Sequence, residues 1–170
     1  GKTRALVHRI AYRIKQGRVP PEQILALTFT NKAAEEMKQR LAKLLEDSNA
    51  AQCVTVGTFH SFCWGILKDR ISSEQEGEKY GLCDEIERQE LIRQALGSLD
   101  MDSGKGESRA WGECISLAKQ RLQGPEEAVE LTRQRPSFPM VYRAYQRELD
   151  ARSAMDFDDL LFITVLRLQE

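Results

Sequence analysis

The stretch Ile24-Leu25-Ala26-Leu27-Thr28-Phe29-Thr30-Asn31 decides the fold of this chain. Its first six residues form a short, nearly continuous apolar run, which is typical of a β-strand buried on both faces. Thr30-Asn31 then offers a helix N-cap, and the apolar residues that follow recur at helical spacing: they are Ala33, Ala34, Met37, Leu41, Leu44 and Leu45. The sequence therefore predicts a buried strand that leads directly into an amphipathic helix.

The segments on both sides continue this alternation. Upstream, the apolar spacing from Thr3 to about Gln16 predicts a helix that Gly17 ends. Downstream, Val54–Gly57 is a second strand-like run, and a further helix is expected from Thr58 to about Leu67. Helix and strand alternating in this way predict a parallel α/β sheet, whose first strand we expect to precede this chain.

The pattern changes after Arg70. Residues 71–81 are polar and contain glycine, as at a domain boundary, and only helical patterns follow. A flexible loop is expected at 100–108, and Asp156 with Asp159 has the N-cap and N3 spacing of a last helix start. The other helices are expected at 84–99, 109–122, 125–133 and 136–149.

Composition excludes several classes of protein. The 170 residues are 41% hydrophobic and 30% charged, as in ordinary soluble globular domains. This excludes a disordered tail, a collagen-like repeat and a disulfide miniprotein, and no apolar run is long enough for a membrane span. The net charge of −1 excludes a globally basic coat protein. Because the chain starts without Met, we expect it to begin inside a larger protein.

The charge is unevenly distributed along the chain. Residues 1–45 carry ten basic and three acidic side chains, whereas residues 74–113 carry eleven acidic and five basic ones. A basic first part predicts an anionic ligand near the N-terminus.

The four cysteines lack metal-ligand spacing, and only two histidines accompany them. We interpret them as free buried thiols in a reducing cytosol rather than as a zinc site.

Gly1-Lys2-Thr3 at the start of a helix matches the end of the phosphate-binding pattern G-x-x-x-x-G-K-[ST]. In the full pattern, backbone N–H groups surround the phosphates, the lysine neutralises the β/γ oxygens and the threonine holds Mg²⁺. The tripeptide alone is weak, but the helix, strand and helix that follow it are the order that a P-loop domain requires.

Two strand ends carry similar polar and aromatic residues. Thr28-Phe29-Thr30-Asn31-Lys32 follows the first strand, and Thr58-Phe59-His60 follows the second. In open α/β sheets, ligands bind at the carboxyl ends of the strands. In a nucleic-acid site at this position, Phe29 would stack on a base, and Thr30, Asn31 and Lys32 would hold the sugar–phosphate chain. The alternative is that Phe29 fills the core and that Thr30 or Asn31 only caps the helix.

These blocks resemble the N-terminal part of superfamily 1 DNA helicases of the UvrD/PcrA/Rep type. Gly1–Arg4 is similar to the end of their motif I, Leu27–Met37 to motif Ia, and Gly57–Cys63 to the next DNA-contacting motif. Three later stretches fall in the family's order: Ile115–Lys119, Val141–Gln146 and Met155–Leu161.

The resemblance implies a fold and a domain order. It implies an incomplete RecA-like P-loop sheet, subdomain 1A, over 1–72, and an all-helical inserted subdomain 1B over 73–152. The helix at 153–170 would return to 1A.

The resemblance also implies an ATP-driven motor that moves along single-stranded DNA, usually 3′ to 5′. The motor would unwind duplex at single-strand/double-strand junctions in repair or replication, with partner proteins unspecified. Gly1, Lys2, Thr3 and Arg4 would bind ATP, with Lys2 on the β/γ phosphates and Thr3 on Mg²⁺. The DNA track would be lined by Thr28, Phe29, Thr30, Asn31, Lys32, Thr58, Phe59 and His60.

Other parts of the family pattern are expected outside this chain. The adenine-reading Gln and the first P-loop glycines would precede Gly1, and the Asp-Glu pair that binds Mg²⁺ and activates water would follow Glu170. Asp158 and Asp159 are not that metal-binding pair, because no apolar strand precedes them and a helix start accounts for them. Because phosphoryl transfer needs these groups, we expect this chain alone not to hydrolyse ATP.

Three alternatives stay open on the sequence. The chain could be the motor part of a helicase–nuclease of the AddA/RecB type, or a non-catalytic DNA-binding remnant of the fold. A different P-loop enzyme, such as a kinase, would require the T-F-T-N block to be accidental.

Overall fold

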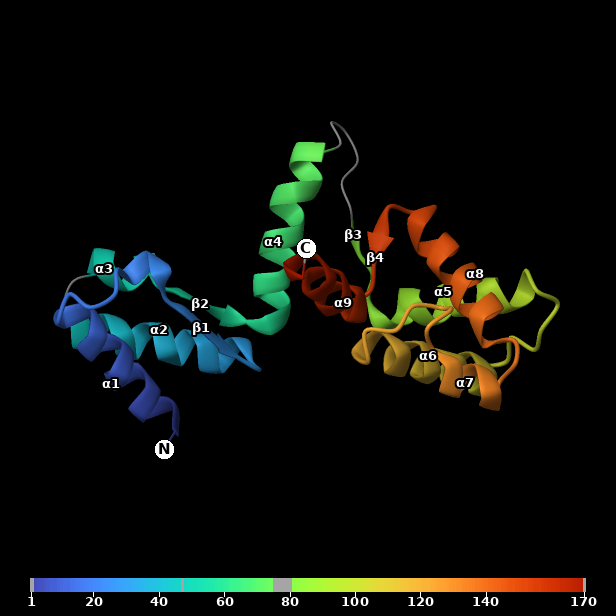
Figure 1. Ribbon diagram of the computed structural model, residues 1–170, viewed down its shortest axis with the longest axis horizontal. Helices are drawn as coiled ribbons and strands as arrows, with labels where there is room; N and C mark the ends of the chain where they lie inside the picture. Colours follow the sequence, from blue (N-terminus) through green and yellow to red (C-terminus); the bar gives the residue numbers. More distant parts are fainter. Residues whose placement is uncertain (1, 47, 75–80, 170) are drawn as a thin grey trace. The chain divides into compact units, whose positions relative to one another are not determined.

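The structure is a computed structural model, and it describes residues 2–46, 48–74 and 81–169. The chain divides into two compact units, Gly1–Phe62 and Cys63–Glu170, which we call the N-terminal and the C-terminal unit (Figure 1). Each unit has a hydrophobic cluster of its own. Within the described ranges, no helix is both long and apolar enough to cross a membrane.

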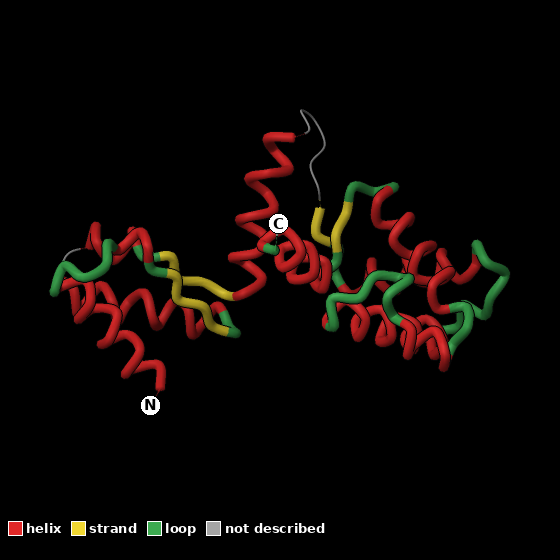
Figure 2. The backbone as a smooth tube through the Cα atoms, viewed as in Figure 1, coloured by secondary structure: helices red, strands yellow, loops and turns green. Residues whose placement is uncertain are grey.

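The N-terminal unit contains a two-stranded parallel sheet with helices packed beside it (Figure 2). Leu25 lies opposite Thr55 and Thr28 opposite Thr58, so both strands end at the same level. The elements are α1 (Lys2–Lys15), a 3₁₀ turn (Pro21–Gln23), β1 (Leu25–Thr28), α2 (Asn31–Leu45), α3 (Ser48–Cys53), β2 (Thr55–Thr58) and the start of α4 (Phe59–Glu74). The predicted parallel pairing of the two strands is confirmed.

The core of this unit lies between the apolar faces of α1 and α2 and the strands. α2 buries Met37 and Leu41, and α1 buries Val7. The expectation that the first strand is buried on both faces was wrong, because Leu25 is 45% exposed and only Ala26 of β1 is fully buried. Among the described residues, β1 has one strand neighbour, β2, so its other edge is unpaired in this small sheet.

The C-terminal unit is built mainly from helices. Its elements after α4 are β3 (Gly81–Leu82), α5 (Glu85–Gly97), α6 (Lys105–Gln120), α7 (Val129–Gln134), α8 (Phe138–Asp150), β4 (Ala154–Met155) and α9 (Phe157–Leu168). β3 pairs with β4 in parallel over two residues each. This pair was not predictable from the sequence, because two-residue strands are too short to show an alternating pattern.

Several elements differ from those expected, among them α7, which begins at Val129 rather than at residue 125. α4 continues to Glu74, so part of the polar boundary expected at 71–81 is helical; residues 75–80 of it lie outside the described residues. α6 begins at Lys105, inside the expected loop, since Gly104 occupies the N-cap position. The short helix α3 has no apolar periodicity and was not predicted. Helix ends are the least certain part of such predictions because helices are marked more clearly by their apolar face than by their ends.

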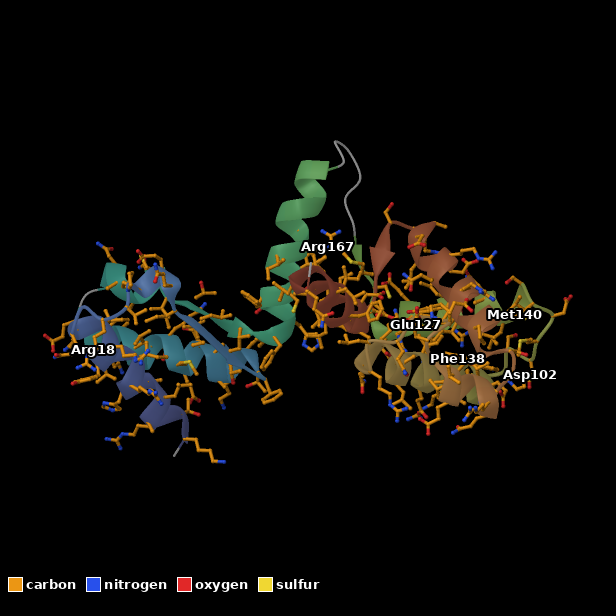
Figure 3. The ribbon with its side chains drawn as sticks, viewed as in Figure 1. Arg18, Asp102, Glu127, Phe138, Met140 and Arg167 are labelled. Carbon is orange, nitrogen blue, oxygen red and sulfur yellow. The ribbon has the colours of Figure 1, made fainter. Side chains whose placement is uncertain are left out.

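The core of the C-terminal unit forms where α5, α6 and α8 meet. Phe138 is fully buried and lies among these helices (Figure 3), with Ile92, Ile115 and Tyr145 equally inaccessible. At Gly112 of α6, an added Cβ would lie 3.0 Å from Ile92 Cδ1, closer than almost all side-chain contacts, so Ile92 would have to shift. This glycine therefore allows α5 and α6 to approach closely.

A candidate nucleic-acid interface at the ends of two strands

The carboxyl ends of β1 and β2 bring two phenylalanines together. Because Thr28 and Thr58 are paired in register, the residues that follow them, Phe29 and Phe59, leave the sheet side by side. Their ring centroids are 5.5 Å apart and the ring planes are inclined by 43°. We call Phe29 and Phe59 the aromatic pair. The two strand ends therefore present their aromatic residues side by side.

Phe29 does not fill the core of the N-terminal unit. It is 90% exposed and Phe59 is 39% exposed, whereas the core side chains nearby are almost inaccessible. A phenylalanine held in water gives up the stabilisation that burial would provide, about 1.5–3 kcal/mol for a full side chain. An exposed apolar surface bordered by polar residues commonly marks a binding site.

The start of α2 adds polar groups beside Phe29. Thr30 is the N-cap, and its hydroxyl accepts a hydrogen bond of 3.2 Å from the backbone N–H of Ala33. Asn31 and Lys32 follow in the exposed first turn, which contains no acidic residue. The positive end of the helix dipole and the Lys32 ammonium therefore both favour a negatively charged ligand. Thr30 therefore caps α2, as the alternative interpretation expected, although Phe29 does not fill the core as that interpretation required.

Thr58 is used inside the protein. It is 7% exposed, and its hydroxyl accepts a bond of 3.1 Å from the Ser61 backbone N–H. The Ser61 hydroxyl in turn accepts a bond of 2.9 Å from the Thr58 backbone N–H, so the two side chains cap the start of α4 reciprocally. Of the residues expected on the DNA track, Thr58 is buried and Thr28 half-buried. The exposed ones are Phe29, Thr30, Asn31, Lys32, Phe59 and His60.

The residues expected at ATP phosphates lie in the first turn of α1. Lys2, Thr3 and Arg4 are all exposed there, and no acidic residue accompanies them. Gly1 lies outside the described residues. A cation, a hydroxyl and a helix N-terminus without a carboxylate suit an anionic phosphate chain. Thr3 offers a single oxygen toward Mg²⁺, and no group of three or more His, Cys, Asp or Glu side chains that could hold a metal occurs in the described part of the chain.

A second polar cluster is buried in the C-terminal unit, at the start of α9. Asp156 is the N-cap and Asp159 the N3 residue of a capping box, as expected from their spacing. The fully buried Lys119 Nζ lies 2.8 Å from Asp156 and 2.7 Å from Asp159. The Tyr145 hydroxyl donates a bond of 2.7 Å to Asp156, and Arg88 Nε lies 3.6 Å from the same carboxylate. The cluster joins α9 to α5, α6 and α8.

The pKa values of the two carboxylates in this cluster are shifted in opposite directions. Burial and the neighbouring Asp156 raise the pKa of Asp159 to about 6, although Lys119 opposes this. Burial alone would also raise the pKa of Asp156, but Lys119 and the hydrogen bond from Tyr145 lower it below its ordinary value. The pair therefore holds a single dominant negative charge beside Lys119 in weakly acidic solution.

Comparison with known proteins identifies the family of this chain. The family model described as the UvrD/REP helicase N-terminal domain matches residues 1–170. The chain belongs to this family. Two relatives are ATP-dependent DNA helicases PcrA, one of Staphylococcus epidermidis at 41% identity and one of Staphylococcus aureus at 40%. Each match covers 97% of this chain and 23% of the relative, so the chain spans about a quarter of the length of these proteins.

Part of this UvrD/REP-type structure was not predictable from the sequence. Lys119 and Arg88 were not expected as partners of the buried carboxylates, because charged residues on a helix usually face solvent. All four thiols were expected to be buried, but Cys53 is exposed and Cys114 half-buried. The buried Cys83 fits the interpretation, since burial raises its pKa to about 11 and keeps it protonated.

Proposed function

We propose that the chain is the N-terminal part of an ATP-dependent DNA helicase and that its N-terminal unit binds a single DNA strand across the aromatic pair. The observation that carries this proposal is the exposed position of Phe29 beside Phe59 at the ends of two parallel strands. Family membership and the names of the PcrA relatives support the motor activity.

The proposed contact uses stacking together with charge. An aromatic ring presented to solvent stacks on a base of any sequence, at about 1–3 kcal/mol per base. Lys32 and the first N–H groups of α2 would hold the adjacent phosphate, while Asn31 and the exposed His60 would contribute hydrogen bonds. Such a site binds single strands, because the bases of a duplex are already stacked and paired.

The proposed nucleotide site is the first turn of α1. There the Lys2 ammonium would neutralise the β/γ phosphate oxygens, the Thr3 hydroxyl would bind Mg²⁺, and Arg4 would lie near the nucleotide. Hydrolysis of bound ATP supplies the free energy for movement. In this proposal the strand is traversed 3′ to 5′ and duplex is unwound at junctions in repair or replication. The subdomains are 1A over 1–72 and 153–170 and 1B over 73–152.

Replacement of Lys2 tests the proposed motor. In the full-length protein, Lys2→Ala should abolish ATP hydrolysis stimulated by single-stranded DNA while DNA affinity changes little, because the aromatic pair is intact. Lys38→Ala, an exposed lysine of α2 without an assigned role, is the matched control and should keep full turnover. Unchanged hydrolysis in Lys2→Ala rejects the phosphate assignment. DNA binding without any hydrolysis in the unaltered protein identifies a non-catalytic member of the family.

A further inference from the structure

The turn from β2 into α4 is held by one serine. The Ser61 Oγ accepts hydrogen bonds from the Thr58 backbone N–H at 2.9 Å and from the Thr58 hydroxyl at 3.1 Å. It also donates a bond of 2.9 Å to the Thr58 carbonyl oxygen. β2 leads directly into α4 (Figure 1), and Phe59 and His60 lie between the two bonded residues. The position of these two side chains is therefore tied to Ser61.

This turn is a capping box without a charged member. In the common form of the motif, the third residue of the helix is glutamate or glutamine, whose side chain accepts the N–H of the N-cap residue. The capping boxes of α5 and α9 have Glu87 and Asp159 at this position. A carboxylate there also interacts favourably with the positive end of the helix dipole. Ser61 caps α4 but does not provide this favourable charge.

The start of α4 shares its lack of acidic residues with the start of α2. Neither first turn contains an aspartate or a glutamate, whereas those of α5, α6, α7 and α9 each contain at least one, and that of α8 none. Because Thr28 and Thr58 are paired in register, the positive ends of α2 and α4 lie at the same edge of the sheet. A carboxylate at either end would repel the phosphates of a strand that is stacked on Phe29.

We propose, on the basis of the function proposed above, that Ser61 is a positioning residue of the DNA interface. Its hydroxyl fixes the turn that presents Phe59 and His60, and its neutrality keeps the start of α4 attractive to phosphate. The alternative is that Ser61 only stabilises α4. That role accounts for the bonds to Thr58 but not for a neutral group, because Ser61 is exposed and a longer acidic side chain would have room.

Three variants of Ser61 separate position from charge. Ser61→Ala removes the bonds, Ser61→Gln restores a neutral capping side chain, and Ser61→Glu restores capping with a negative charge. The affinity of the 170-residue chain for a fluorescein-labelled single-stranded 20-nucleotide DNA is measured by anisotropy at low and at high salt.

We expect Ser61→Ala to bind this DNA roughly three- to tenfold more weakly than the unaltered chain, because Phe59 and His60 are no longer held in place. Ser61→Gln should bind within about twofold of the unaltered chain. Ser61→Glu should be at least as stable as Ser61→Gln but should bind roughly three- to tenfold more weakly at low salt, and high salt should reduce this difference. A purely structural role of Ser61 predicts equal binding by the last two variants.

Ser98→Ala is the matched control, because it removes a serine hydroxyl that donates a bond of 2.8 Å to the Ala95 carbonyl oxygen in the C-terminal unit. It should bind DNA almost normally. The proposal is overturned if Ser61→Ala binds as tightly as the unaltered chain, or if Ser61→Gln and Ser61→Glu bind equally at low salt. Circular dichroism shows whether each variant is folded, and the comparison of Gln with Glu remains decisive where Ser61→Ala is less stable.

Phe29→Ala, titrated alongside, distinguishes failure of this role from failure of the proposed function. If Phe29→Ala binds the single strand as tightly as the unaltered chain, the proposed DNA interface is rejected, and the role of Ser61 with it. If Phe29→Ala binds weakly while the Ser61 variants bind normally, only the role of Ser61 is rejected.

Discussion

Gly57 shows how one residue controls the position of the aromatic pair. A Cβ at this position would lie 2.8 Å from Ser61 Oγ, the atom that accepts the Thr58 N–H. The glycine therefore allows the serine to cap α4 at the level where β2 ends, and Phe59 follows directly. Gly57 was expected in a strand, but its close contact with Ser61 was not predictable, since Ser61 approaches through the first turn of α4.

The variant Gly57→Ala should destabilise the N-terminal unit by about 1 kcal/mol, because the new methyl group displaces the capping hydroxyl. Ser61→Ala removes the same hydrogen bonds without a clash. Chemical denaturation of both single variants and the double variant measures the coupling. We expect the double variant to be little less stable than Ser61→Ala alone. Two fully additive losses would contradict the proposed contact.

Among the helices, α9 depends most on buried charge. Its first residues contact Lys119 of α6 and Tyr145 of α8, so its position is determined by electrostatic contacts as well as by apolar packing. The capping box of α9 was predictable because its spacing is local in sequence. The partners were not, because they lie 37 and 11 residues away and contact depends on how the helices pack.

Stability of the C-terminal unit should rise as the pH falls from 8 toward 5. Because the pKa of Asp159 is raised to about 6, the folded state binds a proton that the unfolded state, with an ordinary value of 3.8, does not bind in this range. Asp156, whose pKa is lowered, contributes stability that is lost only as the pH falls below that ordinary value. Thermal unfolding followed by tryptophan fluorescence reports this unit, since Trp64 and Trp111 both belong to it.

Asp159→Asn should abolish the rise in stability of the C-terminal unit between pH 8 and pH 5. Asp150→Asn, at an exposed position in α8, should retain it. Both histidines of the chain, His8 and His60, lie in the N-terminal unit and do not obscure the measurement. A melting temperature of the unaltered protein that is constant or falls between pH 8 and pH 5 would contradict the pKa assignment.

For the whole molecule, sequence predicted most elements and a first boundary after residue 72, whereas packing divides the chain into compact units at another point. Local spacing found the parallel strands, α2 and the capping box of α9, because each of these signals lies within a few residues. Packing places the division of the chain between Phe62 and Cys63, within α4. No local signal marks that point, since the helix continues through it. The exposure of Phe29 could not be predicted from the sequence either, because an apolar residue after a strand suits both the core and a binding surface.

The two separate cores predict two unfolding transitions. Leu41→Ala, in the N-terminal unit, should lower only one transition, at a cost of about 2–5 kcal/mol for a fully buried leucine. Lys119→Met should lower only the other, by about 3–5 kcal/mol, because it leaves two buried carboxylates without their cation. Lys105→Met, exposed on the same helix, is the control. Calorimetry that shows one transition, shifted equally by both variants, would contradict this division.

The most direct test of the proposed interface is the affinity of the 170-residue chain for a fluorescein-labelled single-stranded 20-nucleotide DNA, compared with that of Phe29→Ala. The matched control is Tyr12→Ala, which removes an aromatic ring from α1 that is 54% exposed. The exposed aromatic pair predicts that Phe29→Ala loses about 1–3 kcal/mol, or roughly five- to more than a hundredfold in affinity, while Tyr12→Ala binds almost normally. Equal affinity of Phe29→Ala and the unaltered chain would contradict the assignment of Phe29 to the DNA track.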